Sequence, residues 1–265
     1  LLANLQNEVS LKLQAHGDIS INNKIEATGD AALNVTLNTN LGGAADSNLV
    51  VNDYILTNGG DILIGGGSAG DASGFVTGNG VAVSINESIR SYGGDIVIRG
   101  KSTSASLAGA AGVLVSSKQI FSDAGQLSLY GEFESTHLEA RGVRLDINDN
   151  IAGSVDSWLP AGSDSFSVEA ARAVLHSSKA TDNAIYISAI NTGTSTNNAQ
   201  IGLDVNWIGN MKSGAGNAAN TAPFFANGGG NVVLTTGNSI GRIRVPAGVY
   251  INGNHGGEYH LITKS

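Results

Sequence analysis

A phrase of glycine, a polar residue and alternating aliphatic residues recurs along this 265-residue chain. Its clearest copies are Gly60-Asp61-Ile62-Leu63-Ile64, Gly94-Asp95-Ile96-Val97-Ile98 and Gly125-Gln126-Leu127-Ser128-Leu129. Gly17-Asp18-Ile19-Ser20-Ile21 is interpreted as an earlier copy and Gly230-Asn231-Val232-Val233-Leu234 as a late one. Aliphatic residues at i and i+2 are typical of a strand with one buried face. Strands this short cannot bury that face alone, so the phrase predicts stacked coils.

A second phrase alternates with the first. Its copies are Gly80-Val81-Ala82-Val83, Gly112-Val113-Leu114-Val115 and Gly142-Val143-Arg144-Leu145, with Gly248-Val249-Tyr250-Ile251 as a candidate last copy. An isolated isoleucine follows each of the first three copies, namely Ile89, Ile120 and Ile151. If coils have about twenty residues, the chain holds roughly thirteen of them over about 60 Å. The thirty-odd-residue unit then covers between one and a half and two coils, and the sequence leaves that choice open.

Composition agrees with an all-β protein. The chain has 37 glycines, 3 prolines and only 5% aromatic residues, so its core must be built from valine, isoleucine, leucine and alanine. We therefore predict that residues 1–265 form one right-handed parallel β-helix, or β-solenoid. Two ranges break the repeat and are expected to be loop insertions: 152–165, which contains Trp158, and 209–230, which contains Phe224 and Phe225.

Charge and hydropathy exclude several classes of function. The net charge is −8 and the 14 lysines and arginines are scattered, which argues against nucleic-acid binding. The chain has no cysteine, so it has neither disulfides nor thiolate metal sites. No apolar run approaches the roughly 20 residues that span a bilayer, so we expect no membrane span.

The repeats resemble those of a known family. The phrases Gly59-Gly60-Asp61-Ile62-Leu63-Ile64 and Ile89-Arg90-Ser91-Tyr92-Gly93-Gly94, alternating with the glycine-valine phrase, are similar to the shaft repeats of two-partner-secretion exoproteins. That group includes filamentous haemagglutinin and the high-molecular-weight adhesins of Gram-negative bacteria. The resemblance is best from about residue 15 to 150. It implies a segment of a large secreted protein that passes an outer-membrane secretion pore, lies at the bacterial cell surface and mediates adhesion to a glycan or protein receptor.

Three glycine-rich motifs have simpler explanations than catalysis. Gly65, Gly67 and Gly70 have the spacing of a dinucleotide-binding turn, but the residues that follow do not predict the helix that this site requires. The run 66–70 has the pattern of a serine nucleophile elbow, which needs the same strand-to-helix turn. The run 95–102 approaches a phosphate-binding loop, but Asp95 stands where its first glycine should be. We expect no cofactor at any of them.

Two groups of residues could bind metal ions. Stacking of Asp18, Asp61 and Asp95 would provide calcium ligands. Capping of turns explains these acids better, because Gln126 and Asn231 replace them in other copies. The run 254–260, which contains His255, Glu258 and His260, offers zinc ligands but has the composition of a terminal turn. The sequence therefore predicts no metal site.

The predicted function is structural and adhesive, without catalytic residues. Trp158, Phe224 and Phe225 are the candidate partner-binding residues, because exposed aromatic side chains are favoured anchors. Asn34 and Asn86 begin Asn-x-Ser/Thr sequons and are candidate glycosylation sites. One alternative is a polysaccharide lyase or hydrolase, for which the nearest acidic cluster is Asp146, Asp149 and Asp156. The other is a filament subunit that self-associates through bare strand edges.

Overall fold

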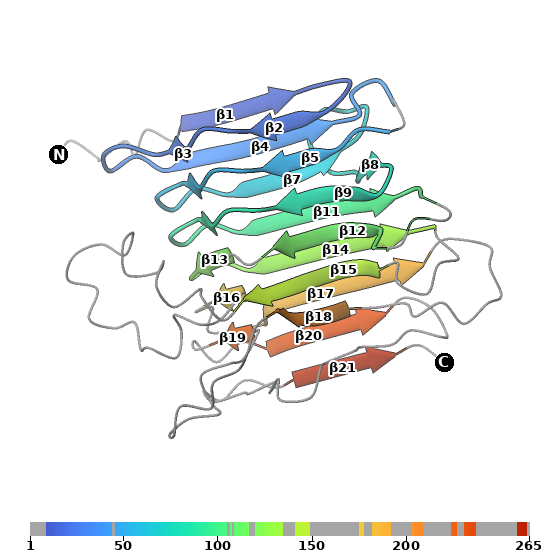
Figure 1. Ribbon diagram of the computed structural model, residues 1–265. Helices are drawn as coiled ribbons and strands as arrows, with labels where there is room; N and C mark the ends of the chain where they lie inside the picture. The colour runs from blue at the N-terminus through green and yellow to red at the C-terminus, as the bar shows by residue number, and fades with distance from the viewer. Residues whose placement is uncertain are drawn as a thin grey trace.

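The computed structural model describes a β-solenoid (Figure 1). It describes residues 9–43, 46–104, 107, 109–116, 120–134, 141–148, 175–177, 182–191, 203–208, 224–226, 231–236 and 259–263. These residues contain strands and turns but no helix, and neighbouring strands of the three sheets pair in parallel. The predicted all-β parallel β-helix is confirmed.

The three sheets form the walls of the solenoid. Sheet A contains β1 (Val9–Gln14), β4 (Leu33–Thr39), β7 (Ile62–Gly66), β11 (Ile96–Ser102), β14 (Leu127–Phe133), β17 (Asn183–Asn191), β20 (Asn231–Thr236) and β21 (Tyr259–Thr263), and β8 (Val76–Gly78) pairs with β11. Sheet B contains β2 (Ile19–Ile21), β5 (Leu49–Val51), β9 (Val81–Ile85), β12 (Ala111–Ser116), β15 (Arg141–Asn148) and β18 (Leu203–Ile208). Sheet C contains β3 (Ile25–Glu26), β6 (Ile55–Leu56), β10 (Ile89–Arg90), β13 (Ile120–Asp123), β16 (Leu175–Ser177) and β19 (Phe224–Ala226).

One recurrence of the first phrase corresponds to one coil. Ile62 pairs with Ile96, and Ile96 pairs with Leu127, so consecutive copies lie directly above one another in sheet A. The estimate of about thirteen coils is therefore wrong, because each coil contains a strand from all three sheets and is longer than assumed. The main path of sheet A has eight described strands, which span about 34 Å at a spacing of ~4.8 Å.

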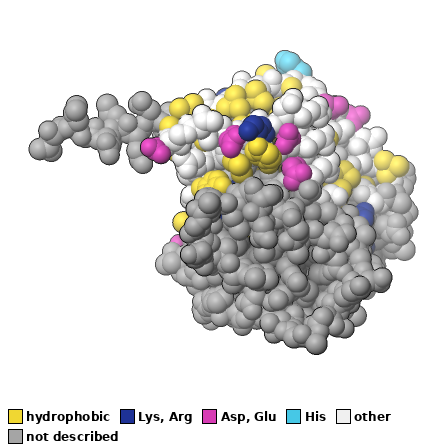
Figure 2. All heavy atoms as spheres, turned by 60° about the vertical axis from the view of Figure 1, so that its left-hand side comes forward, with side chains coloured by type: hydrophobic (Ala, Val, Ile, Leu, Met, Phe, Trp, Pro, Cys, Tyr) yellow, Lys and Arg dark blue, Asp and Glu magenta, His cyan; other side chains and the backbone are white. Residues whose placement is uncertain are grey.

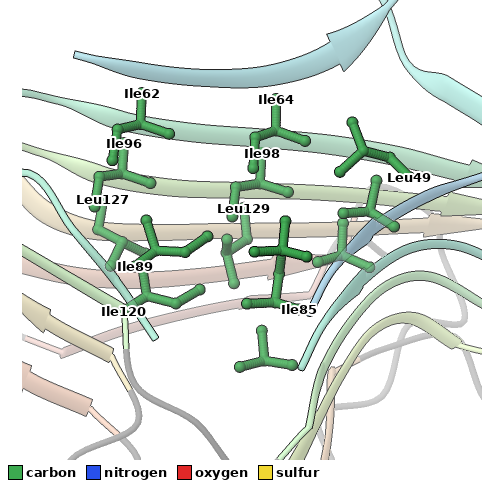
Figure 3. Close-up of a cluster of buried hydrophobic side chains, with 14 of the residues drawn as sticks. Leu49, Ile62, Ile64, Ile85, Ile89, Ile96, Ile98, Ile120, Leu127 and Leu129 are labelled. Atoms are coloured by element: carbon green, nitrogen blue, oxygen red, sulfur yellow. The ribbon is translucent and has the colours of Figure 1, made fainter. Parts of the chain in front are cut away.

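The core consists of aliphatic columns, as the low aromatic content predicts (Figure 3). One column contains Ile62, Ile96 and Leu127, and each of these side chains is fully buried. Sheet C adds Ile89 and Ile120 from the adjoining wall, also fully buried. Burying a side chain of this size stabilises the fold by about 1.5–3 kcal/mol, so the stacked columns are the main source of stability.

Buried hydroxyl groups close the corner between sheets C and A. Ser91 donates its hydroxyl to the carbonyl of Gly94, and Thr57 and Ser122 make the equivalent bonds to Gly60 and Gly125. All three hydroxyl-bearing residues are buried, and a buried hydroxyl without an acceptor would be costly. The residue after each hydroxyl has a positive φ, which is why each corner turns within so few residues.

The corner acids cap the backbone of the next coil. Asp61 Oδ1 accepts a hydrogen bond from Asp95 N, and Asp95 Oδ1 accepts one from Gln126 N, each at 2.8 Å. This confirms the capping interpretation. Asp18 makes the same kind of bond to Asn48 N, but at a different corner. The reason is that Ile19–Ile21 pairs with β5 in sheet B, so 17–21 is not a copy of the first phrase.

The first two copies of the second phrase pair with a shift of two residues from the predicted alignment. Val83 pairs with Val113, and Ala111 pairs with Val81, so Gly80 and Gly112 are not equivalent. Gly80 lies in a turn with φ of 85°, whereas Gly112 lies within β12. A shift of two residues leaves the same side chains pointing inward, which is why the alternation alone did not reveal it.

The structure also changes the interpretation of the later segments of the sequence. The isoleucine column of sheet C continues from Ile120 to Leu175, so Ile151 is not its next member; Ile151 itself lies outside the described residues. Residues 152–165 and most of 209–230 also lie outside them. Within 209–230, however, β19 (Phe224–Ala226) pairs in parallel with β16. Phe224 and Phe225 therefore belong to the wall and not to an inserted loop, because Phe224 occupies the register position of Leu175.

Candidate functional site

The described part of the structure shows no surface formed by the residues predicted for partner binding. Trp158 lies outside the described residues, and Phe224 and Phe225 lie in β19 of sheet C. Of the acids considered for an enzyme, Asp146 lies in β15, while Asp149 and Asp156 are outside the described part. His260 lies in β21, and His255 and Glu258 are not described.

The glycine-rich motifs lie in strands and turns. Gly65 and Gly66 end β7, and the chain then turns through Gly67 and Gly70 before it enters β8. A dinucleotide site or a nucleophile elbow would require a helix at this point. The run 95–102 lies almost entirely in β11, so it does not form a phosphate-binding loop.

The two sequons lie in hydrogen-bonded ladders. Asn34 is half-buried, and its Oδ1 accepts a bond from Asp61 N at 2.8 Å. Asn86 is exposed, and its Nδ2, the atom that a glycan would modify, donates to Asn52 Oδ1 at 3.0 Å. Asn52 in turn donates to Asn22. Modification of Asn86 would have to retain or replace this bond, and glycosylation of both residues stays a prediction.

Basic side chains are few on the described part of the sheet C side (Figure 2). Lysine and arginine side chains are isolated among uncoloured polar groups in this view, and acidic groups lie beside the most prominent basic one. Lys24 on this side lies 2.7 Å from Glu26 and 5.7 Å from the centre of the Tyr54 ring. Such an exposed pair contributes little to stability, and the described residues in this view form no basic stripe.

The outer surface of sheet A carries a concentrated group of rings and charges. We call Arg99, Tyr130 and Tyr186 the tyrosine-arginine face. The Arg99 guanidinium lies 5.1 Å from the centre of the Tyr130 ring, within the range of a cation–π interaction. The centres of the Tyr130 and Tyr186 rings are 5.6 Å apart, with their planes inclined at 45°.

Strand alternation places these three residues outside. In β11 the buried residues alternate with half-buried ones, and Arg99 is one of the half-buried set. Tyr130 follows the buried Leu129, and Tyr186 lies between the buried Ile185 and Ile187. Arg99 pairs with Tyr130 across neighbouring coils, whereas Tyr186 pairs with Ser128 in the adjacent column. The tyrosine rings are therefore diagonal neighbours on consecutive strands.

An ion cluster borders the tyrosine-arginine face. Lys101 Nζ lies 2.6 Å from a carboxylate oxygen of Glu134 and 3.8 Å from one of Glu132. Lys101 and Glu132 occupy paired positions on β11 and β14. Among the described residues, Arg99 forms no ion pair, and its guanidinium donates a long hydrogen bond of 3.5 Å to the Ala72 carbonyl. The face therefore offers aromatic surface beside a cation that no carboxylate of the described residues neutralises.

Glu132 should make stability depend on pH. Burial raises the pKa of this carboxyl above its ordinary value, against the opposing effect of Lys101. The folded state therefore binds the Glu132 proton more tightly than the unfolded state does. The stabilisation that results is present at low pH and is lost as pH rises through the raised pKa. We expect the melting temperature of E132Q, relative to the unmodified chain, to rise between about pH 4 and about pH 7. A relative fall would instead indicate that the ion pair with Lys101 dominates.

The comparisons with known proteins give no family. No family model, no curated protein and no solved structure matches this chain. The assignment of function therefore depends on the fold and on the chemistry of its surface. Within the described residues, no group of three or more histidines and acids could hold a metal ion, and no helix is long and apolar enough to cross a membrane.

Sequence reasoning did not find the tyrosine-arginine face. Tyr130 directly follows a recognised copy of the first phrase, but the copy at Ile185-Tyr186-Ile187 was not recognised. Its isoleucines at i and i+2 were the available signal. Aligning them with Leu127 and Leu129 would have placed Tyr186 beside Ser128 on the outer surface, next to Tyr130.

Proposed function

We propose that this chain is a non-catalytic adhesive segment of the shaft of a large secreted bacterial surface protein. The observation that carries the proposal is the tyrosine-arginine face, which a hydrogen-bonded parallel wall holds on its outer surface. A stacked solenoid is stiff along its axis and can hold such a surface away from a membrane. The resemblance of the repeats to two-partner-secretion exoproteins supports export through an outer-membrane pore and display at the cell surface.

The charges on the outer wall favour binding over catalysis. Glycoside hydrolysis uses two carboxyl groups placed on either side of the scissile bond. Glu132 and Glu134 both contact Lys101, so these two carboxylates belong to one ion cluster. By contrast, Arg99 and the two tyrosines provide an attractive surface without a pair of acids arranged for proton transfer.

The test is a binding assay combined with an assay for new reducing ends. The purified 265-residue chain is applied to a glycan array and to cultured host cells, and in parallel to pooled plant and bacterial polysaccharides. We expect saturable binding that disappears when the chain is thermally unfolded, with no new reducing ends. Absence of binding to any of these surfaces would contradict adhesion, and release of reducing ends would favour the polysaccharide-active enzyme.

A further inference from the structure

The tyrosine-arginine face has the dimensions of a site for a linear carbohydrate. Its three residues come from β11, β14 and β17, which are consecutive strands of sheet A. Consecutive strands lie ~4.8 Å apart, and one pyranose unit of an extended polysaccharide has a similar length. A sugar chain that runs along the solenoid axis can therefore place one ring on each coil.

The chemistry of the three side chains matches successive sugar units. Aromatic rings pack against the apolar faces of pyranose rings, and Tyr130 and Tyr186 present neighbouring rings with centres 5.6 Å apart. Arg99 lies one strand before Tyr130 and directly in its column. A guanidinium binds a carboxylate through two parallel hydrogen bonds, so this position favours a sugar that carries a carboxyl group.

The border of the face carries one lysine and two glutamates. The Lys101 ammonium is already paired with Glu132 and Glu134, so among the described residues here Arg99 is the cation available to an acidic ligand. The carboxylates of Glu132 and Glu134 can accept hydrogen bonds from sugar hydroxyls. A flat and mostly hydroxylated ligand suits this site, because the outer surface of stacked strands is itself extended and shallow.

We propose that the tyrosine-arginine face binds a linear polysaccharide containing uronic acid, with consecutive sugars on consecutive coils and a carboxylate on Arg99. This inference rests on the proposed adhesive function and names its ligand class. The same chemistry occurs in host glycosaminoglycans and in plant or bacterial uronans. Both sources are therefore included in the test.

The experiment measures binding of the whole chain by isothermal titration calorimetry. The ligands are hyaluronan oligosaccharides and polygalacturonate oligosaccharides of increasing length, with cello-oligosaccharides as the neutral comparison. We expect affinity to rise with length until about three or four sugars are bound and then to level off. The acidic series that binds more tightly identifies the source. The neutral series should bind at least tenfold more weakly than that series, on the order of the tenfold difference that ~1.4 kcal/mol gives.

The variants are Y130S, Y186S and R99Q, with Y54S as the matched control. Tyr54 is also a half-exposed tyrosine, but it lies on the sheet C side. Y130S and Y186S should each weaken binding about tenfold, and R99Q should remove the preference for acidic over neutral oligosaccharides, while Y54S should bind as the unmodified chain does. Far-UV circular dichroism and the melting temperature establish that each variant is folded.

Three outcomes would overturn the inference. In the first, Y130S and Y186S bind as tightly as the unmodified chain. In the second, acidic and neutral oligosaccharides bind with equal affinity. In the third, neither acidic series binds. If the chain still attaches to cells in any of these cases, the adhesive function stands and only its ligand is wrong; if it attaches to nothing, both proposals fail.

Discussion

Replacement of Gly94 with alanine should destabilise the chain by about 3 kcal/mol or more. Gly94 lies at the corner before β11, where the backbone passes against the carbonyl group of Gly60 in the preceding coil. A Cβ atom on Gly94 would overlap that carbonyl oxygen and carbon, which are backbone atoms and cannot rotate away. The next corner has the same restriction, because a Cβ on Gly125 would overlap the carbonyl of Gly94. Coil stacking at this corner therefore requires glycine.

The control for G94A is G17A. Gly17 precedes β2, and a Cβ atom built on it meets no atom within 4 Å. Its substitution should leave stability unchanged or raise it slightly, because alanine restricts the unfolded chain. Thermal unfolding followed by far-UV circular dichroism should show a melting temperature about 6 to 12 °C lower for G94A. If G94A and G17A melt together, the coils do not approach one another at this corner as described.

The fold was predictable because its strongest signals are local. Alternating aliphatic residues after a corner glycine, as in Ile96-Val97-Ile98, indicate a strand with one buried face wherever they occur. Glycine at positions 60, 94 and 125 marks the corners for a physical reason, since no larger residue fits there. Repetition of these signals was sufficient to predict a solenoid without knowledge of its coil length.

The coil register was not predictable from the same signals. An inward-facing position repeats every two residues, so copies shifted by two residues have the same pattern, and Gly80 was wrongly aligned with Gly112 for this reason. The phrase at 17–21 has the sequence of a sheet A corner but pairs in sheet B. Which wall a strand joins depends on the lengths of the turns around the whole coil, and these vary along the chain.

The candidate site was less predictable than the fold. Tyr130 and Tyr186 are distant in the sequence and become neighbours only when their coils are stacked in register. Sequence reasoning instead selected Trp158, Phe224 and Phe225, because aromatic residues in polar, glycine-rich surroundings suggest loops. The structure places the two phenylalanines in sheet C, and their function in binding stays a prediction.

Replacement of Asp123 with asparagine should destabilise the chain by about 2–4 kcal/mol, the second large effect that we expect. The Arg90 side chain is 6% exposed and that of Asp123 is 21% exposed. Arg90 Nε and Nη2 each donate to one carboxylate oxygen of Asp123 at 3.0 Å, which joins two consecutive coils at the end of sheet C. Asparagine cannot provide both acceptors or the negative charge, so the buried guanidinium would lose a charge partner and one hydrogen bond.

The substitution is suitable because it preserves the backbone. Asp123 has φ of 53°, a left-handed conformation that asparagine tolerates as well as aspartate does. The Arg90 guanidinium also lies 4.2 Å from the centre of the Tyr92 ring, so it stays in place when its charge partner is removed. The measured loss therefore reports the charge and the second hydrogen bond, not a changed turn.

Two further variants separate the charge effect from packing. E26Q removes the exposed partner of Lys24 and should leave the melting temperature unchanged, because solvent already screens that pair. Adding R90M to D123N should recover part of the lost stability, since an apolar side chain in the same space needs no counter-charge. If D123N is as stable as E26Q, the pair does not hold the coils together. If R90M recovers nothing, the charge of Arg90 is not the cause of the loss in D123N.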